Sequence, residues 1–203
     1  MKLLHIDSSV LGAGSASRVL TSDIVARQIK LHPGIEVVYR DLATDAVLHL
    51  SPAHLAAWQG QAVNDAQLGA DLTKGGAYMQ ELFDADIVVI GAPMYNFTIP
   101  SQLKAWIDRV VVAGKTFRYT ANGPEGLVSG AKKVFIASSR GNVYTPGSAA
   151  APFEHHESYL TSVLNFIGLT DVTIVRAEGL AFGPEARAAA LLKAREHIEG
   201  IAA

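Results

Sequence analysis

Short apolar runs alternate along the chain with longer segments in which apolar residues recur every three or four positions. The runs are too short for helices and lack the alternation of a half-exposed strand, so they predict strands covered on both faces. Five strands are expected, at residues 3–6, 35–39, 87–90, 133–137 and 172–175. The segments between them predict helices, and this alternation is typical of an α/β doubly wound parallel sheet.

Residues 86–112 show this pattern most clearly. The β-branched run at 87–90 predicts a central strand, and the following residues predict an amphipathic helix whose first position suits Pro100. The inner face of that helix carries apolar residues at positions i, i+3, i+4, i+7 and i+8: Leu103, Trp106, Ile107, Val110 and Val111.

The loop at residues 91–99 is unusually apolar for a connection between a strand and a helix. It carries Met94, Tyr95 and Phe97, with Asn96 among them. Ligands of open parallel sheets lie outside the carboxyl ends of the strands, so these side chains offer a platform for a flat ring. Asn96 can both donate to and accept from the edge of such a ring. We therefore expect a planar heteroaromatic cofactor; the alternative is that these aromatic residues are ordinary core beneath a loop.

A serine-rich loop at residues 8–17 follows the first strand, and a helix is expected over residues 18–31 with Ser17 as its N-cap. The hydroxyls of Ser9, Ser15 and Ser17, helped by free amides and the helix dipole, would bind a phosphate. The spacing matches neither a dinucleotide fingerprint nor a P-loop. A pocket of hydroxyls without a lysine suits a terminal monophosphate such as that of FMN; the alternative is a plain capping turn.

A third loop of interest, at residues 139–142, follows the strand at 133–137. Gly141 would let the backbone approach a ligand closely, and Ser139 and Arg140 could supply hydrogen bonds to it. A plain turn is the alternative.

The remaining segments suggest structure more than chemistry. Residues 41–84 are expected to be mostly helical, with a break at residues 75–76. His49 and His54 are interpreted as surface or packing histidines, because neither has a carboxylate at ligand spacing. The segment at 115–126 predicts a long loop of the kind that often forms a lid.

Composition narrows the possible functions. The 203 residues suit one domain over residues 1–203, and no apolar run approaches the ~20 residues of a membrane span. The chain opens on a strand without a signal peptide, so we expect a soluble, cytoplasmic protein. With no cysteine, any redox role falls to a bound cofactor. A net charge of −2 with scattered basic residues gives no footprint for nucleic acid.

Several motifs together resemble one known family. The phosphate loop after the first strand and the ring platform after the third fit a flavodoxin-like sheet of order 2-1-3-4-5. The motifs are Ser8-Ser9 with Ser15-Ala16-Ser17-Arg18, the run at 92–97, Gly114-Lys115-Thr116-Phe117-Arg118-Tyr119-Thr120 with Asn122-Gly123-Pro124, Ser139-Arg140-Gly141, Ala177-Glu178-Gly179 and Gly183-Pro184-Glu185. They resemble the bacterial FMN-dependent NAD(P)H:quinone oxidoreductases and azoreductases over essentially the whole chain.

The resemblance implies roles for residues in three loops. The phosphate of non-covalently bound FMN would be held by Ser9, Ser15, Ala16 and Ser17. The isoalloxazine and ribityl groups would contact Met94, Tyr95, Asn96 and Phe97, and the other polar edge of the flavin would contact Ser139, Arg140, Gly141 and Asn142. Asn142 departs from the family pattern, which usually has a second glycine there and backbone that tends toward the left-handed region.

The resemblance also implies a reaction and a partner. NADH or NADPH would give a hydride to the flavin, and a quinone or an azo compound would then accept it at the same stacking site, which is ping-pong kinetics. No side chain is expected to be a catalytic acid or base, and no metal is expected. The family forms homodimers with FMN near the interface, and Tyr119 and Phe166 match positions that border the substrate pocket.

Two other classes of function remain open at this point. A flavodoxin-like electron carrier, or an FMN-binding module without its own substrate, would share the fold, but carriers are usually strongly acidic and this chain is not. A phosphate-binding regulator without flavin would require the aromatic loop to be mere core.

Overall fold

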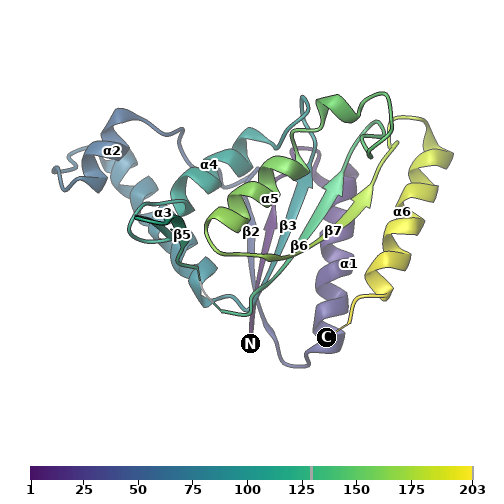
Figure 1. Ribbon diagram of the computed structural model, residues 1–203, viewed down its shortest axis with the longest axis horizontal. Helices are drawn as coiled ribbons and strands as arrows, with labels where there is room; N and C mark the ends of the chain where they lie inside the picture. Colours follow the sequence, from purple (N-terminus) through teal and green to yellow (C-terminus); the bar gives the residue numbers. More distant parts are fainter. Residues whose placement is uncertain (129, 203) are drawn as a thin grey trace.

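The computed structural model describes residues 1–202 apart from Ser129, and its centre is a parallel sheet of five strands (Figure 1). The strands are β1 Lys2–Asp7, β2 Glu36–Asp41, β3 Ile87–Pro93, β6 Lys133–Ser139 and β7 Asp171–Ala177. Their order in the sheet is β2-β1-β3-β6-β7, which is 2-1-3-4-5 when the strands of a separate hairpin are left out of the count. All four neighbouring pairs are parallel.

Helices cover both faces of this sheet (Figure 1). The helices are α1 Ala16–Leu31, α2 Pro52–Trp58, α3 Ala66–Asp84, α4 Ser101–Val110, α5 Glu157–Phe166 and α6 Pro184–Glu199, with short 3-10 turns η1 Gly12–Gly14 and η2 Ala151–Phe153. One hydrophobic core lies between the sheet and α3, α4 and α5, and a second lies between the sheet and α1 and α6. None of the described helices combines the length and hydrophobicity that crossing a membrane requires.

The central strand β3 shows why the strands of this sheet can be predicted from the sequence. All seven of its residues are buried, and alternate residues enter opposite cores, with Val88 and Ile90 on one face and Ile87 and Val89 on the other. A strand buried on both faces has no polar positions, which produces the continuous apolar run.

The register of the strands brings three loops to one edge of the sheet. Asp7 pairs with Gly91, and Pro93 pairs with Ser139. The carboxyl ends of β1, β3 and β6 therefore lie side by side. The serine loop, the aromatic loop and the loop after β6 leave the sheet at this edge, as the parallel topology predicts.

Three helix boundaries differ from the sequence-based expectations. Helix α1 begins at Ala16 with Ser15, not Ser17, as its N-cap, since the Ser15 hydroxyl accepts the Arg18 amide. Helix α4 begins at Ser101, one residue after Pro100. The expected break at residues 75–76 is wrong, because α3 continues through both glycines; Gly75 instead lets the side chain of Arg109 pack against the helix.

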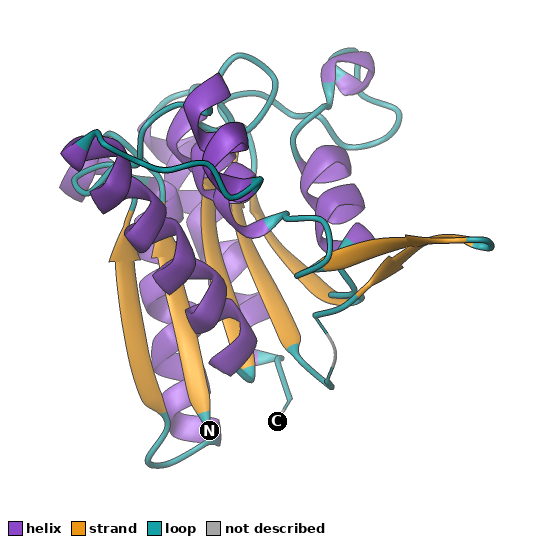
Figure 2. Ribbon diagram, turned by 90° about the vertical axis from the view of Figure 1, so that its left-hand side faces the viewer, coloured by secondary structure: helices purple, strands orange, loops and turns teal. Residues whose placement is uncertain are grey.

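The expected long loop at residues 115–126 is also wrong, because this segment forms an antiparallel hairpin of β4 Phe117–Thr120 and β5 Gly123–Gly126. The hairpin projects away from the body of the molecule (Figure 2). Its base is packed tightly: a Cβ atom on Gly126 would lie 2.2 Å from the amide nitrogen of Gly168, in the turn after α5.

His54 has the carboxylate partner that the sequence did not reveal. Its ring is buried, with Nε2 3.1 Å from Asp71 of α3, and Asp71 also accepts a 2.9 Å bond from Nε of Arg109 in α4. Burial alone would raise the pKa of Asp71, but the Leu48 amide, Arg109 and His54 outweigh that effect and lower it. This triad joins α2, α3 and α4, so His54 is a packing histidine. His49 is exposed.

Candidate functional site

The serine loop forms a cluster of hydroxyls at the start of α1. The hydroxyls of Ser15 and Ser17 lie 3.0 Å apart, and the hydroxyl of Ser9 lies 3.2 Å from that of Tyr95 on the neighbouring loop. All three serines are buried in the described protein. The first amides of a helix have no intrahelical acceptor, so those of Ala16 and Ser17 add donors to the hydroxyls.

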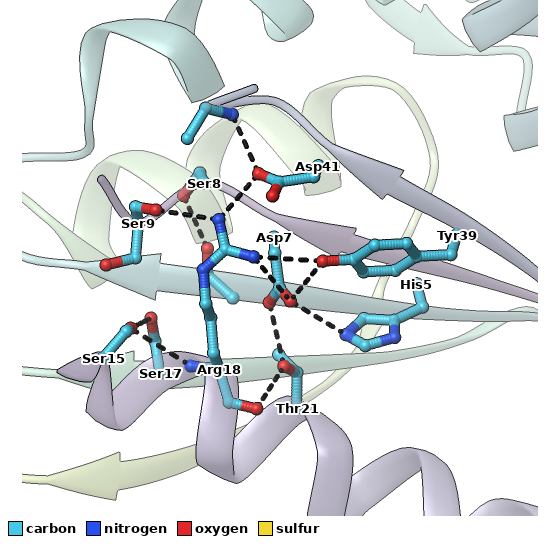
Figure 3. A network of polar contacts seen from close by, with 12 residues as sticks. His5, Asp7, Ser8, Ser9, Ser15, Ser17, Arg18, Thr21, Tyr39 and Asp41 are labelled. Carbon is cyan, nitrogen blue, oxygen red and sulfur yellow. Dashed lines mark hydrogen bonds and ion pairs between the residues drawn. The ribbon is translucent and has the colours of Figure 1, made fainter. Parts of the chain in front are cut away.

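A network of charged side chains lies directly behind this loop (Figure 3). One guanidinium, that of Arg18, lies 2.7 Å from Asp41 of β2 and 3.6 Å from Asp7 of β1, and it donates to the Ser9 carbonyl. It also donates to Tyr39. Two carboxylates therefore neutralise this cation, which leaves the loop itself with neutral donors.

Asp7 is the buried centre of that network. It accepts bonds from the hydroxyls of Thr21 and Tyr39 at 2.8 and 3.1 Å. Burial alone would raise the pKa of Asp7, but His5, Thr21 and Arg18 outweigh this effect, so its pKa lies below the ordinary value. The space for its carboxylate comes from Gly91, where a Cβ atom would lie 2.6 Å from Oδ1.

The aromatic loop after β3 has strained backbone. Asn96 and Phe97 both have positive φ, 47° and 72°, which is rare for residues with side chains and especially so for a bulky one. A tight turn closed by Tyr95 and Thr98 holds them, with backbone bonds of 2.9 and 3.1 Å. Phe97 remains 45% exposed, so this strain presents a large ring to solvent instead of burying it. Such strain is typical of binding sites.

The loop after β6 is linked to the aromatic loop through the backbone. The Met94 amide donates to the Ser139 carbonyl at 2.8 Å, next to the pairing of Pro93 with Ser139. Gly141 and Asn142 are exposed, and Asn142 does not have a positive φ, so the side chain that replaces the usual glycine causes no backbone strain.

The side chain of Arg140 takes a different place from the one expected. It is buried and lies among carboxylates, with Nη2 2.9 Å from Glu178 and 3.2 Å from Glu157, and Nη1 3.9 Å from Glu154. Its guanidinium is therefore engaged within the protein, and its backbone is what remains for a cofactor.

Tyr119 and Phe166 are joined to each other through Phe117 and not to the serine loop. The ring of Phe117 lies 5.5 Å from that of Tyr119 and 4.6 Å from that of Phe166. Tyr119 is 76% exposed on the projecting hairpin, whereas Phe166 packs partly buried against the core. Neither residue lines the cavities described next.

Two cavities border the predicted cofactor residues at this edge. One, of 610 Å³, is lined by Ser9 and Ser15 of the serine loop together with Arg18. The other, of 530 Å³, is lined by Tyr95 and Asn96 of the aromatic loop. The carboxylates of Asp23 and Asp41 also line the first cavity, but its serine hydroxyls and the amides at the start of α1 can donate to a phosphate. The half-buried ring of Tyr95 and the side chain of Asn96 at the second cavity suit a flat ring, so the residues present fit FMN.

The residues that support these loops carry little signal in the sequence. Asp7 lies one residue beyond the strand expected at residues 3–6, and its partners Thr21 and Tyr39 come from two other elements, α1 and β2. A strand that ends in a carboxylate without an obvious partner was the signal available. The carboxylates around Arg140 gave no comparable signal.

Comparison with known proteins agrees with this geometry. A family described as a flavodoxin-like fold matches residues 1–201. FMN-dependent NADH:quinone oxidoreductase 2 of Bradyrhizobium diazoefficiens is 56% identical over 191 residues, covering 94% of both chains. The protein of that name from Pseudomonas aeruginosa is 54% identical over 201 residues, covering 98% of both chains.

Solved structures point the same way. An azoreductase from Bacillus anthracis str. Sterne superimposes with a TM-score of 0.83 at 30% identity, covering 99% of this chain and 100% of that one. An FMN-dependent NADH-azoreductase from Bacillus anthracis str. Ames Ancestor, solved in complex with FMN, has a TM-score of 0.85 at 26% identity, covering 98% of both chains. This chain therefore belongs to the flavodoxin-like family of FMN-dependent NADH:quinone oxidoreductases.

Proposed function

We propose that this protein is an FMN-dependent NADH:quinone oxidoreductase that also reduces azo compounds. The observation that carries the proposal is the meeting of a hydroxyl cluster and a strained, exposed aromatic loop at the carboxyl edge of adjacent strands β1 and β3. The names of relatives more than 50% identical over nearly the whole chain support the same function.

The phosphate of FMN would bind at the start of α1. The hydroxyls of Ser9, Ser15 and Ser17 and the amides of Ala16 and Ser17 would donate to its oxygens. Arg18 would support phosphate binding without contacting the phosphate, because its hydrogen bond to the Ser9 carbonyl fixes the serine loop.

The ring of FMN would lie against the aromatic loop and the loop after β6. Met94, Tyr95, Asn96 and Phe97 would contact the isoalloxazine and ribityl groups, and Ser139, Gly141, Asn142 and the Arg140 backbone would border the polar edge. The bond from the Met94 amide to Ser139 keeps these two loops together.

When bound, FMN supplies the chemistry of the reaction, accepting a hydride from NADH and passing it to the acceptor. The protein orients both partners in turn at one slot, excludes water from it and offers backbone dipoles, and no side chain needs to act as acid or base. One slot used in turn implies ping-pong kinetics.

A homodimer would complete the site. Tyr119 and Phe166 line neither cavity of their own chain, and the hairpin that carries Tyr119 projects from the body of the molecule, free to reach a second copy (Figure 2). In such a dimer these two residues would border the acceptor slot of the partner.

The visible spectrum of the purified protein tests the function and separates it from its rivals. We expect flavin absorbance that bleaches on addition of NADH alone and returns on addition of a quinone. A protein without flavin absorbance would be a phosphate-binding regulator instead. A flavin that NADH alone does not bleach would indicate an electron carrier.

A further inference from the structure

A buried cluster of charges lies beside the proposed flavin site without belonging to the phosphate loop or the ring platform. Its centre is Arg140, at the carboxyl end of β6. Three carboxylates surround this guanidinium: Glu154 before α5, Glu157 in the first turn of α5 and Glu178 after β7. Arg176 of β7 bonds to Glu157 at 2.7 Å. The side chain of Arg140 thus joins the end of β6 to the start of α5 and to the segment after β7.

Two of these three carboxylates in turn hold backbone at the edge of the site. Glu178 accepts the amide of Tyr144 at 2.7 Å and also binds the hydroxyl of Thr145. Glu154 accepts the amides of His156 and Glu157 at 2.9 and 2.6 Å, which caps the start of α5. The cluster therefore fixes the loop after β6 and the segment that leads into α5.

These two segments present aromatic rings to the aromatic loop. The ring of Phe97 lies 5.3 Å from that of Phe153 and 6.5 Å from that of Tyr144. The Arg140 guanidinium lies 5.9 Å from the centre of the Tyr144 ring. One backbone hydrogen bond, from the His155 amide to the Phe97 carbonyl at 3.1 Å, joins the segment before α5 to the aromatic loop.

The three rings need external support. Phe97 and Phe153 are 45% and 52% exposed, so burial alone does not hold them in place. Phe97 also has strained backbone, which persists only when neighbouring structure enforces it. The charge cluster is the buried structure that reaches both of its ring partners.

We propose that Arg140 is a positioning residue, which through Glu154 and Glu178 holds the rings of Phe97, Tyr144 and Phe153 in the arrangement that borders the flavin and the acceptor. It acts without touching either ligand through its side chain. The inference rests on the proposed function, because it assigns a role toward the same site.

The test compares Arg140→Lys with Arg109→Lys. Both arginines are 2% exposed and bind buried or half-buried carboxylates, but Arg109 belongs to the His54–Asp71 triad and reaches none of the three rings. Lysine keeps the charge and loses the planar fork that serves several carboxylates at once. Both variants should lower the thermal midpoint.

Only the Arg140 variant should change the site. We expect Arg140→Lys to keep FMN bound through the serine loop, to alter the visible circular dichroism of the bound flavin, and to lower kcat/KM for a quinone about tenfold or more, because misplacement by ~1 Å is costly. Arg109→Lys should keep the parent's dichroism and kcat/KM within about twofold. Equal behaviour of the two variants would overturn the proposal.

A second pair of variants, with smaller changes, keeps the test informative if Arg140→Lys fails to fold. Glu178→Gln removes one carboxylate of the cluster, and Glu81→Gln is its matched control, since the two side chains are 16% and 17% exposed and both pair with an arginine. We expect altered dichroism and a raised KM for the quinone only in Glu178→Gln. Unchanged values in this variant as well would refute the role of the cluster.

A double-mutant cycle tests the route of the effect. If Arg140 acts through the rings, then Arg140→Lys should change kcat/KM by less than about twofold in a Phe97→Ala background, because the ring to be positioned is gone. Full additivity would overturn the proposal. Failure of the proposed function would look different, as a parent protein with neither flavin absorbance nor reductase activity, and would overturn both.

Discussion

At the scale of single residues, the phosphate loop distinguishes two serines that look equivalent in the sequence. Ser15 caps α1, whereas the hydroxyl of Ser17 contacts Ser15 and no backbone group of the helix end. Replacing Ser17 should therefore affect the ligand with less effect on the helix, and replacing Ser15 should affect both.

We predict that FMN binds more weakly when these hydroxyls are removed. Ser17→Ala should cost about 1 kcal/mol of binding free energy, and Ser15→Ala with Ser17→Ala about 2 kcal/mol, or roughly 30-fold in the dissociation constant. Quenching of FMN fluorescence during titration measures this, with Ser162→Ala, at an exposed position of α5 away from the serine loop, as control. Unchanged FMN affinity in the double variant would contradict the placement of the phosphate at this loop.

His156 is a buried histidine whose protonation equilibrium differs strongly from that of an exposed histidine. Neither ring nitrogen hydrogen-bonds within the described protein. Burial first, and then the charge of Arg140, lower the pKa of His156 to about 4, against partial opposition from the charge of Glu154. A folded pKa below the unfolded one means that acid favours unfolding.

We therefore predict a loss of stability between pH 6.5 and 4 that depends on His156. In this window the unfolded chain binds a proton that the folded chain does not. The free energy of unfolding should therefore decrease as the pH is lowered, by about 3 kcal/mol in total for this group. His156→Gln should flatten the curve measured by urea unfolding. His49→Gln, at an exposed position, is the control. An equally steep curve in both variants would contradict the assignment.

At the scale of elements, helix α3 contains adjacent glycines with opposite roles. A Cβ atom on Gly75 would lie 2.9 Å from Cδ of Arg109, whose side chain is held by Asp71 and by the Leu48 carbonyl. A Cβ atom on Gly76 would meet nothing within 4 Å, and Gly76 is exposed.

Alanine should therefore act in opposite directions at these two positions. Gly76→Ala should stabilise the protein by about 0.5 to 1 kcal/mol, because glycine is a poor helix former. Gly75→Ala should destabilise it, since the locked arginine has to move. Each variant is the control for the other in chemical denaturation, and equal shifts would contradict this account of α3.

The same helix shows where sequence patterns reach their limit. Strands such as β3 are predictable because burial on both faces leaves a run of apolar residues that needs no partner to be recognised. The glycine pair looked like a break because its tertiary reason, the side chain of Arg109, lies more than 30 residues away in the chain.

The candidate site divides in the same way. Its loops were predictable from local chemistry, namely serines before a helix and aromatic residues after a strand. The partners of Asp7 and the carboxylates around Arg140 were not, because each contact joins residues that only the fold brings together. The hairpin at Phe117–Gly126 was missed because its strands are four residues long and mostly exposed, which leaves little apolar alternation.

At the scale of the whole molecule, the separation of Tyr119 from the serine loop predicts a dimer. Val10 and Leu11 in that loop are 56% and 63% exposed, and a partner would cover them. Light scattering should give twice the chain mass of 21.5 kDa, with an interface on the order of 2,000 Å² or more. A fully active monomer at assay concentration would contradict this.

Acceptor choice should then depend on the projecting hairpin. Tyr119→Ala should leave stability and FMN content nearly intact, because the side chain is 76% exposed. An aromatic contact is worth roughly 0.5 to 1.5 kcal/mol beyond its area, so the ratio of kcat/KM for a small quinone and a bulky azo dye should move about two- to tenfold.

Phe166→Ala should move the same ratio and should also lower stability, because its ring packs on Phe117. Measured ratios equal to the parent's in both variants would place the acceptor pocket elsewhere.

The close packing of Gly126 against Gly168 affects which positions of the hairpin can change during evolution. The base of the hairpin tolerates no side chain at Gly126, whereas the tip is closed by its own bonds, from Thr120 to the Gly123 carbonyl and from the Asn122 amide to Thr120. Mutations can therefore accumulate at the tip of the hairpin, while the packed base keeps the orientation of the hairpin relative to the sheet. A lineage could explore new acceptors through tip residues alone, without passing through unstable ancestors.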